Sequence, residues 1–302
     1  MARTTRTLGR GPASQRRLLK LTQKRLERFV TLLPKVLAND DPETIHDLRV
    51  GSRRLQQTLK VSIQQKTSGR RKIIRDLRRV RKALGPCRNL DVNRELVQRL
   101  IQESQSPVTR QGWQRLAMHL KEQRAPLLAA ARKQVAKCEL APFIERARKL
   151  ISHAQVHTDP TAKMAAAVKR SIAQWDDALR LAEEDRAADS LHSLRIATKR
   201  LRYRAELLSE SGSAALAPML KDLKQIQSAM GDWHDRSMLV QYAEEVLAGP
   251  DFSSRQPEVS GALLTEMEKE KQRNEEAIET ILSRAAKLRK GWNSGRAGSG
   301  AP

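Results

Sequence analysis

Aromatic residues are scarce in this sequence and make up 3% of its 302 residues. Proteins that grip single-stranded nucleic acid stack bases on aromatic side chains, so the sequence is not typical of that class. Its only cysteines, Cys87 and Cys138, exclude a disulfide framework and a cysteine-based zinc site. No apolar run is long enough to span a membrane, and residues Met1–Gly11 lack the apolar core of a secretory signal. We therefore expect a cytoplasmic protein.

Acidic residues are also scarce. The chain has 34 Asp and Glu against 58 Lys and Arg, which gives a formal net charge of +24. Self-repulsion of this size opposes a compact state. A polyanionic partner that neutralises the charge is therefore expected.

Strand signals are absent, because no stretch alternates apolar and polar residues and no β-branched run occurs. Apolar residues instead recur at helical spacing, which predicts an all-α fold. Asp41 and Pro42 are typical of an N-cap and a first helical position. The predicted helices are Ser14–Ala38, Pro42–Lys66, Arg70–Leu84, Leu90–Glu103, Gln111–Glu122, Pro126–Glu139, Pro142–His153, Thr161–Glu184, Ala188–Glu210, Ala214–Met230, Asp232–Ala248 and Glu258–Lys290.

One motif occurs twice, as residues 46–55 (HDLRVGSRRL) and 192–201 (HSLRIATKRL). On a helix, His46, Arg49 and Arg53 share one face, while Leu48 and Leu55 lie on the other. The second copy places His192, Arg195 and Lys199 opposite Leu194 and Leu201 in the same way. Each copy is therefore predicted to be an amphipathic helix with a row of cations and a histidine at its N-terminal end.

The two copies belong to a longer repeat. An offset of 146 residues aligns Arg17 through Gly85 with the second half without a gap, and it matches the histidine, the cations and the helix-stopping glycines 85 and 231. We predict two helical bundles related by a pseudo-twofold axis around a basic groove. The expected parts are a flexible basic tail at 1–13, a first half at 14–157, a second half at 158–290 and a disordered tail at 291–302.

Basic residues form stripes on the predicted helices, and these stripes lack the interleaved acids that balance an ordinary solvated face. Several stripes recur in both halves, and Arg88 and His234 hold equivalent positions in the turns that follow. Arrays of Arg and Lys suit a repeating phosphate chain, and they also suit the backbone of a nucleic acid. The candidate ligands read from these stripes and turns are Arg17, Lys20, Lys24, His46, Arg49, Arg53, Lys72, Arg75, Arg79, Lys82, Arg88, Lys163, Arg170, His192, Arg195, Lys199, Arg202, Lys221, Lys224 and His234.

The histidines allow a further interpretation, since His46 and His192 could meet near the twofold axis and hold a metal. No H-E-x-x-H pattern or carboxylate pair completes such a site, so phosphate hydrogen bonding or helix packing is favoured. Catalysis finds no support. The sequence has no nucleophile elbow, P-loop or dinucleotide fingerprint, and no acidic cluster able to hold Mg²⁺. We therefore expect a binding protein with no cofactor and no metal.

In these residues the sequence resembles the CHAD family, the conserved histidine α-helical domain. The family has an H-x-L-R-[VI]-x-[TS]-[RK]-[RK]-L helix in each of two halves, and the second copy continues here as Arg202-Tyr203 in agreement with it. The turns at Leu84–Asp91 and Gly231–Asp235 also match. Asn89 departs from the aspartate usual in the first turn, and Gly51 lies inside the first motif helix, where glycine costs about 1 kcal/mol relative to alanine.

The resemblance implies two four-helix bundles around a basic groove that binds inorganic polyphosphate, and recruitment to polyphosphate granules. It adds Arg54 and Tyr203 to the candidate ligands. The leading hypothesis is a non-catalytic polyphosphate-binding protein, expected as a monomer. A nucleic-acid or nucleoid-associated protein is the alternative, and a histidine-based metal protein is the third hypothesis.

Overall fold

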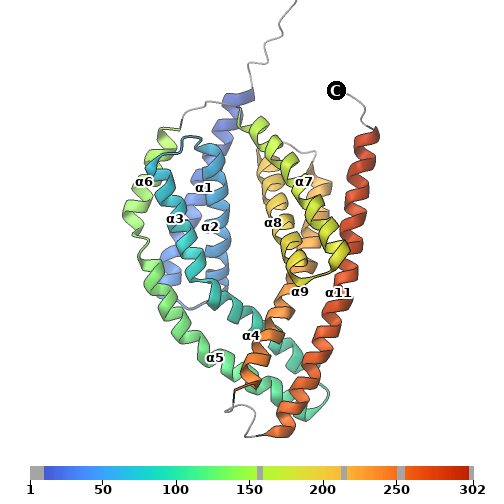
Figure 1. The fold of residues 1–302 in the computed structure, drawn as a ribbon. Coiled ribbons are helices and arrows are strands. Elements are labelled where there is room, and N and C mark those ends of the chain that lie inside the picture. The colour runs from blue at the N-terminus through green and yellow to red at the C-terminus, as the bar shows by residue number, and fades with distance from the viewer. Residues whose placement is uncertain (1–9, 155–158, 212–215, 250–255, 299–302) are drawn as a thin grey trace, which may run out of the picture. The chain divides into compact units, whose positions relative to one another are not determined.

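The described part of the chain is entirely helical apart from turns and caps, which confirms the predicted all-α fold. A computed structural model describes residues 10–154, 159–211, 216–249 and 256–298 (Figure 1). No strand occurs among these residues, and none of their helices is long and apolar enough to cross a membrane. The helices are α1 (Arg10–Ala38), α2 (Pro42–Ser62), α3 (Ser68–Ala83), α4 (Gly85–Glu103), α5 (Pro107–Ala136), α6 (Leu140–Ser152), α7 (Pro160–Asp185), α8 (Ala188–Glu210), α9 (Ala217–Leu247) and α11 (Pro257–Gly298).

The chain divides into two compact units. The first comprises Met1–Arg88, Pro126–Lys169 and Tyr203–Leu216, and the second comprises Asn89–Ala125, Arg170–Arg202 and Ala217–Pro302. Each unit draws residues from both predicted halves of the sequence. The division into halves at residues 157 and 158, the pseudo-twofold axis and the groove stay predictions.

In the first unit, α1, α2, α3 and α6 lie side by side (Figure 1). Their apolar faces form one core, in which the rings of Phe29 and Phe143 have centroids 5.1 Å apart. Leu48 and Leu55 are fully buried in it, as the amphipathic pattern of the motif predicts. The cationic face of α2 therefore has a fixed orientation, because the opposite face is buried.

Local signals position α2 and α3. Asp41 caps α2 as predicted, and its carboxylate accepts hydrogen bonds from the backbone N–H groups of Glu43 (3.3 Å) and Thr44 (2.9 Å). Thr67 caps α3 by accepting from the N–H of Arg70 at 3.2 Å. These caps fix where each basic stripe begins.

In the second unit, α9 packs against α11, and the second motif helix is buried through Leu194 and Leu201. The indole N–H of Trp175 on α7 donates to the hydroxyl of Thr198 on α8 at 2.9 Å. The motif's apolar side is therefore also fixed in this unit.

Two predicted helix breaks differ from the structure. α9 runs through Gly231, where the sequence predicts a helix stop, because the following residue, Asp232, keeps the N–H that a helix needs. In the first half Pro86 follows Gly85, and there α3 ends at Ala83 before α4 begins. α5 is likewise continuous through Pro126, where two segments were expected.

The predicted tails also differ. Residues 10–13 belong to α1, and residues 1–9 lie outside the described residues. Residues 291–298, predicted to be disordered, continue α11. Within this segment the ring of Trp292 packs against that of Trp175 with centroids 5.0 Å apart.

Candidate functional site

The first motif helix places three arginines close together on its polar face and on α3. Arg49 donates from Nη1 to the backbone carbonyl of Arg81, which lies in the last turn of α3. Burial, followed by the charges of Arg53 and Arg88, lowers the pKa of Arg49 to about 10. Burial is also the main effect that lowers the pKa of Arg81 to about 10, and the charges of Arg53, Arg78 and Arg49 lower it further. Among the described residues, no carboxylate is part of either effect, so the cluster is a half-buried group of like charges.

Tyr203 completes this cluster. Its buried phenol oxygen accepts a hydrogen bond from Nη1 of Arg53 at 3.2 Å, and Cζ of Arg53 lies 5.6 Å from the centroid of its ring. A cation held over a tyrosine ring loses rotational freedom. The contact thus orients Arg53 without neutralising it.

Arg81 is a member of the cluster that the sequence interpretation missed. Its guanidinium donates to Oε1 of Gln56 on α2 and lies 3.5 Å from Oγ of Ser52. The 146-residue offset gave no signal for it, because position 81 is equivalent to Gln227, which is not a cation.

The second motif helix carries a corresponding cluster. The rings of His192 on α8 and His234 on α9 have centroids 5.9 Å apart. Burial lowers the pKa of His234 to about 4, with further contributions from Arg195, Lys199 and His192. His234 is therefore neutral at physiological pH and can donate one hydrogen bond from its ring.

Further residues extend both clusters. Arg202 Nε donates to Oε1 of Gln227 at 2.6 Å. In the first unit, burial and the charge of Arg88 lower the pKa of His46. Each motif histidine thus lies near the residue 42 positions further along the chain, Arg88 in one case and His234 in the other.

α3 has basic residues on two different faces, and only one of these faces belongs to the arginine cluster of the first motif helix. Lys72 and Arg79 pair with Asp76, whose side chain is 5% exposed, at 4.0 Å and 3.1 Å. Cys138 lies near the same carboxylate, and burial, with Asp76, raises the pKa of its thiol to about 11. Two of the predicted α3 ligands therefore have an acidic partner, whereas Arg78 and Arg81 lie with the motif arginines.

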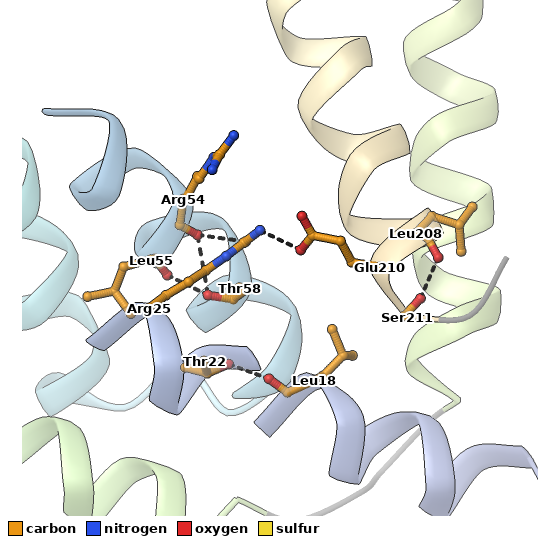
Figure 2. Close-up of polar contacts among 9 residues, drawn as sticks. All are labelled: Leu18, Thr22, Arg25, Arg54, Leu55, Thr58, Leu208, Glu210 and Ser211. Carbon is orange, nitrogen blue, oxygen red and sulfur yellow. Dashed lines mark hydrogen bonds and ion pairs between the residues drawn. The ribbon is translucent and has the colours of Figure 1, made fainter. Parts of the chain in front are cut away.

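A cavity of about 820 Å³ lies in the first unit between α1, α2 and the end of α8. Lys24, Arg25, Arg28 and Arg54 line it, together with Asp47 and Glu210. Figure 2 shows Arg25 extending from α1 to Glu210, at 2.6 Å, while the backbone carbonyl of Arg54 accepts from the same guanidinium. Arg28 pairs with Asp47 at 2.7 Å. Burial lowers the pKa of Arg25 despite the opposing effect of Glu210.

The remaining candidates share an exposed position on helix surfaces and are not among the residues that shift the pKa values of the two clusters. They are Arg17 and Lys20 on α1, Arg75 and Lys82 on α3, Lys163 and Arg170 on α7, and Lys221 and Lys224 on α9. Their part in binding stays a prediction.

In the described part of the chain, no group of three or more His, Cys, Asp or Glu side chains could hold a metal ion. Asp91, in the predicted turn, instead binds Nε of Arg124 at 2.6 Å in a buried ion pair.

Comparisons with known proteins agree with this description. A family model for the CHAD domain matches residues 20–244. The structure is similar to the crystal structure of the CHAD domain from the plant Ricinus communis, with a TM-score of 0.67 and 19% identity over 90% of this chain and 91% of that one. It is also similar to PptA from Streptomyces chartreusis, with a TM-score of 0.66 and 16% identity over 90% and 99%. A search of curated proteins finds no match. At these identities the two structures show a shared fold.

Proposed function

The chain belongs to the CHAD domain family, and on that premise we propose that it binds inorganic polyphosphate through the cations of its two motif helices, without hydrolysing it. The observation that carries the proposal is the cluster of Arg49, Arg53 and Arg81. The charge of Arg53 lies close enough to lower the pKa of both Arg49 and Arg81, and no carboxylate contributes to that effect among the described residues. An anion with several charges would relieve this repulsion.

A flexible phosphate chain fits this cluster better than a nucleic acid does. Arginine binds phosphate oxygens through a planar fork, and neighbouring arginines can hold successive phosphates. Among the described residues, Tyr203 is the aromatic residue that contacts the cluster, and its ring is buried beneath Arg53 and cannot stack on a base. Duplex DNA remains the competitor to test, because it would bind any basic surface through its backbone.

The test is competition between long-chain polyphosphate and duplex DNA at physiological salt. We expect polyphosphate to displace DNA, with no reverse displacement at equal phosphate concentration. Equal displacement in both directions would favour the nucleic-acid alternative and reject the proposal. Incubation with polyphosphate, followed by measurement of released phosphate, tests the absence of hydrolysis, and metal analysis of the purified protein tests the third hypothesis.

A variant pair links the binding to the motif helices. Arg53→Glu with Lys199→Glu reverses one half-buried cation in each unit. Each lost phosphate contact costs roughly tenfold in affinity, so we expect a loss of about a hundredfold or more. Lys35→Glu with Lys287→Glu changes the same total charge at exposed positions of α1 and α11 and serves as the matched control. A protein of this kind would be found at polyphosphate granules in the cytoplasm, which fluorescence microscopy of the tagged chain can check.

A further inference from the structure

The polar faces of α2 and α3 meet along a line of cations that extends beyond the motif. On α2, Arg49, Arg53 and Lys60 are spaced by four and seven residues and so share one face. At 1.5 Å per residue this row is about 16 Å long. On α3, Arg81, Arg78 and Arg70 follow in the opposite direction. We call these six side chains the α2–α3 seam.

Hydrogen bonds between the two helices fix the pairing along the seam. At one end, Arg49 donates to the carbonyl of Arg81, and the Arg81 side chain donates to Gln56. At the other end, Nη2 of Arg70 donates to the carbonyl of Lys60 at 3.1 Å. The two helices therefore run antiparallel, and their cations are held in register from end to end.

The far end of the seam is also a cluster of cations. Burial lowers the pKa of Lys60, and the charges that add to this effect are Arg78, Arg70, Arg81 and Arg204. All of them are cations, and in the described chain no carboxylate counteracts them at Lys60. By contrast, Lys72 and Arg79 on the other face of α3 have Asp76 as a partner.

From this arrangement we infer that the seam binds successive phosphates of one linear chain, and that Lys60 and Arg78 are ligands in addition to Arg49 and Arg53. The inference rests on the proposed function and specifies where the bound chain runs. A single phosphate is too small to contact both ends of a row about 16 Å long. The seam therefore favours chains long enough to reach from Arg49 to Lys60.

The experiment compares two double variants of the full chain. Lys60→Gln with Arg78→Gln removes two charges from the seam, and both side chains are exposed, so the core is untouched. Lys35→Gln with Lys287→Gln removes two charges from exposed positions of α1 and α11 outside the seam. Circular dichroism and thermal unfolding verify that both variants are folded. Calorimetry then measures the affinity for tripolyphosphate and for long-chain polyphosphate at several salt concentrations.

We expect the seam variant to bind long-chain polyphosphate at least about tenfold more weakly than the control does. Its slope of log affinity against log salt should be smaller by roughly one for each lost contact. Tripolyphosphate, bound at the Arg53 end, should change by less than about twofold. Equal long-chain affinities in the two variants would overturn the inference, and so would an equal loss for both ligands in the seam variant. If the unchanged protein binds neither ligand, the proposed function itself fails.

Discussion

Arg81 on α3 donates a hydrogen bond to Oε1 of Gln56 on α2, and in the second unit the same pair occurs with its members exchanged. Adding 146 to 56 and 81 gives positions 202 and 227, which hold Arg202 and Gln227. There the arginine lies on the motif helix and donates to the glutamine of α9 at 2.6 Å. Each half therefore has one arginine and one glutamine paired at these positions, in opposite order.

Exchanging the first pair tests the equivalence of the two orders. Arg81→Gln alone should lower the free energy of unfolding by about 1–2 kcal/mol, because a hydrogen bond from a charged donor is lost. Gln56→Arg combined with Arg81→Gln should recover most of that loss, since it recreates the order of the second unit. Denaturant unfolding of the single and double variants measures both values. If the double variant is no more stable than the sum of the two single changes predicts, the equivalence of the two Arg–Gln pairs is contradicted.

The free energy of unfolding at acid pH should depend on the protonation of His234. Its pKa of about 4 lies below the ordinary 6.5, so between these values the unfolded chain binds more protons than the folded one. The free energy of unfolding should therefore fall as pH is lowered from 6.5 to 4. His234→Asn should make this fall shallower, as measured by denaturant unfolding at a series of pH values. An unchanged profile in the variant would show that other groups cause the fall.

The affinity for polyphosphate should depend on pH in the opposite sense to the free energy of unfolding. Bound phosphates favour the protonated imidazole and raise its pKa, so polyphosphate affinity should increase as the pH is lowered from 7.5 to 5.5. His46, whose pKa is also lowered by burial and by Arg88, should contribute in the same direction. Calorimetry of the His46→Asn, His234→Asn double variant should show a weaker increase.

The ion pair of Arg25 and Glu210 should oppose polyanion binding. Glu210→Gln removes the carboxylate and makes the cavity of the first unit more positive, so polyphosphate affinity should increase by about threefold. Glu183→Gln breaks the pair with Arg289 in the second unit and should leave the affinity unchanged. The same increase in both variants would indicate a general effect of charge, with no special role for the cavity.

Trp292 should stabilise the second unit through its contact with Trp175. Trp292→Ala should lower the free energy of unfolding by about 1–2 kcal/mol, because the indole is partly buried against a second ring. Trp292→Phe should retain most of this energy. Denaturant unfolding and near-ultraviolet circular dichroism provide the measurement, and an alanine variant as stable as the unchanged chain would contradict it.

Helix periodicity was sufficient to predict the all-α fold and the burial of Leu48, Leu55, Leu194 and Leu201. It failed to distinguish Gly85 from Gly231, because both glycines look like helix stops. What differs is the next residue. Pro86 has no backbone N–H and disfavours a continuous helix, which Asp232 does not, although α5 continues through Pro126.

The sequence was less informative about which face of α3 belongs to the site. Half of that helix is basic, so any stripe of cations could be chosen. The spacing of Lys72, Arg75, Arg79 and Lys82 favoured one face. Asp76, the single acid of the helix, is buried and pairs with two of these residues, and its burial could be seen only after α3 and α6 were packed together.

The break between α3 and α4 gives the equivalent motif arginines, Arg49 and Arg195, different surroundings. A helix end leaves its last carbonyls unbonded and carries a partial negative charge, and Arg49 binds one such carbonyl, that of Arg81. α9 has no helix end at the equivalent place, since it is continuous through Gly231. The terminal carbonyl that binds Arg49 therefore has no counterpart beside the second motif helix, and Arg195 must be oriented by groups other than a helix end.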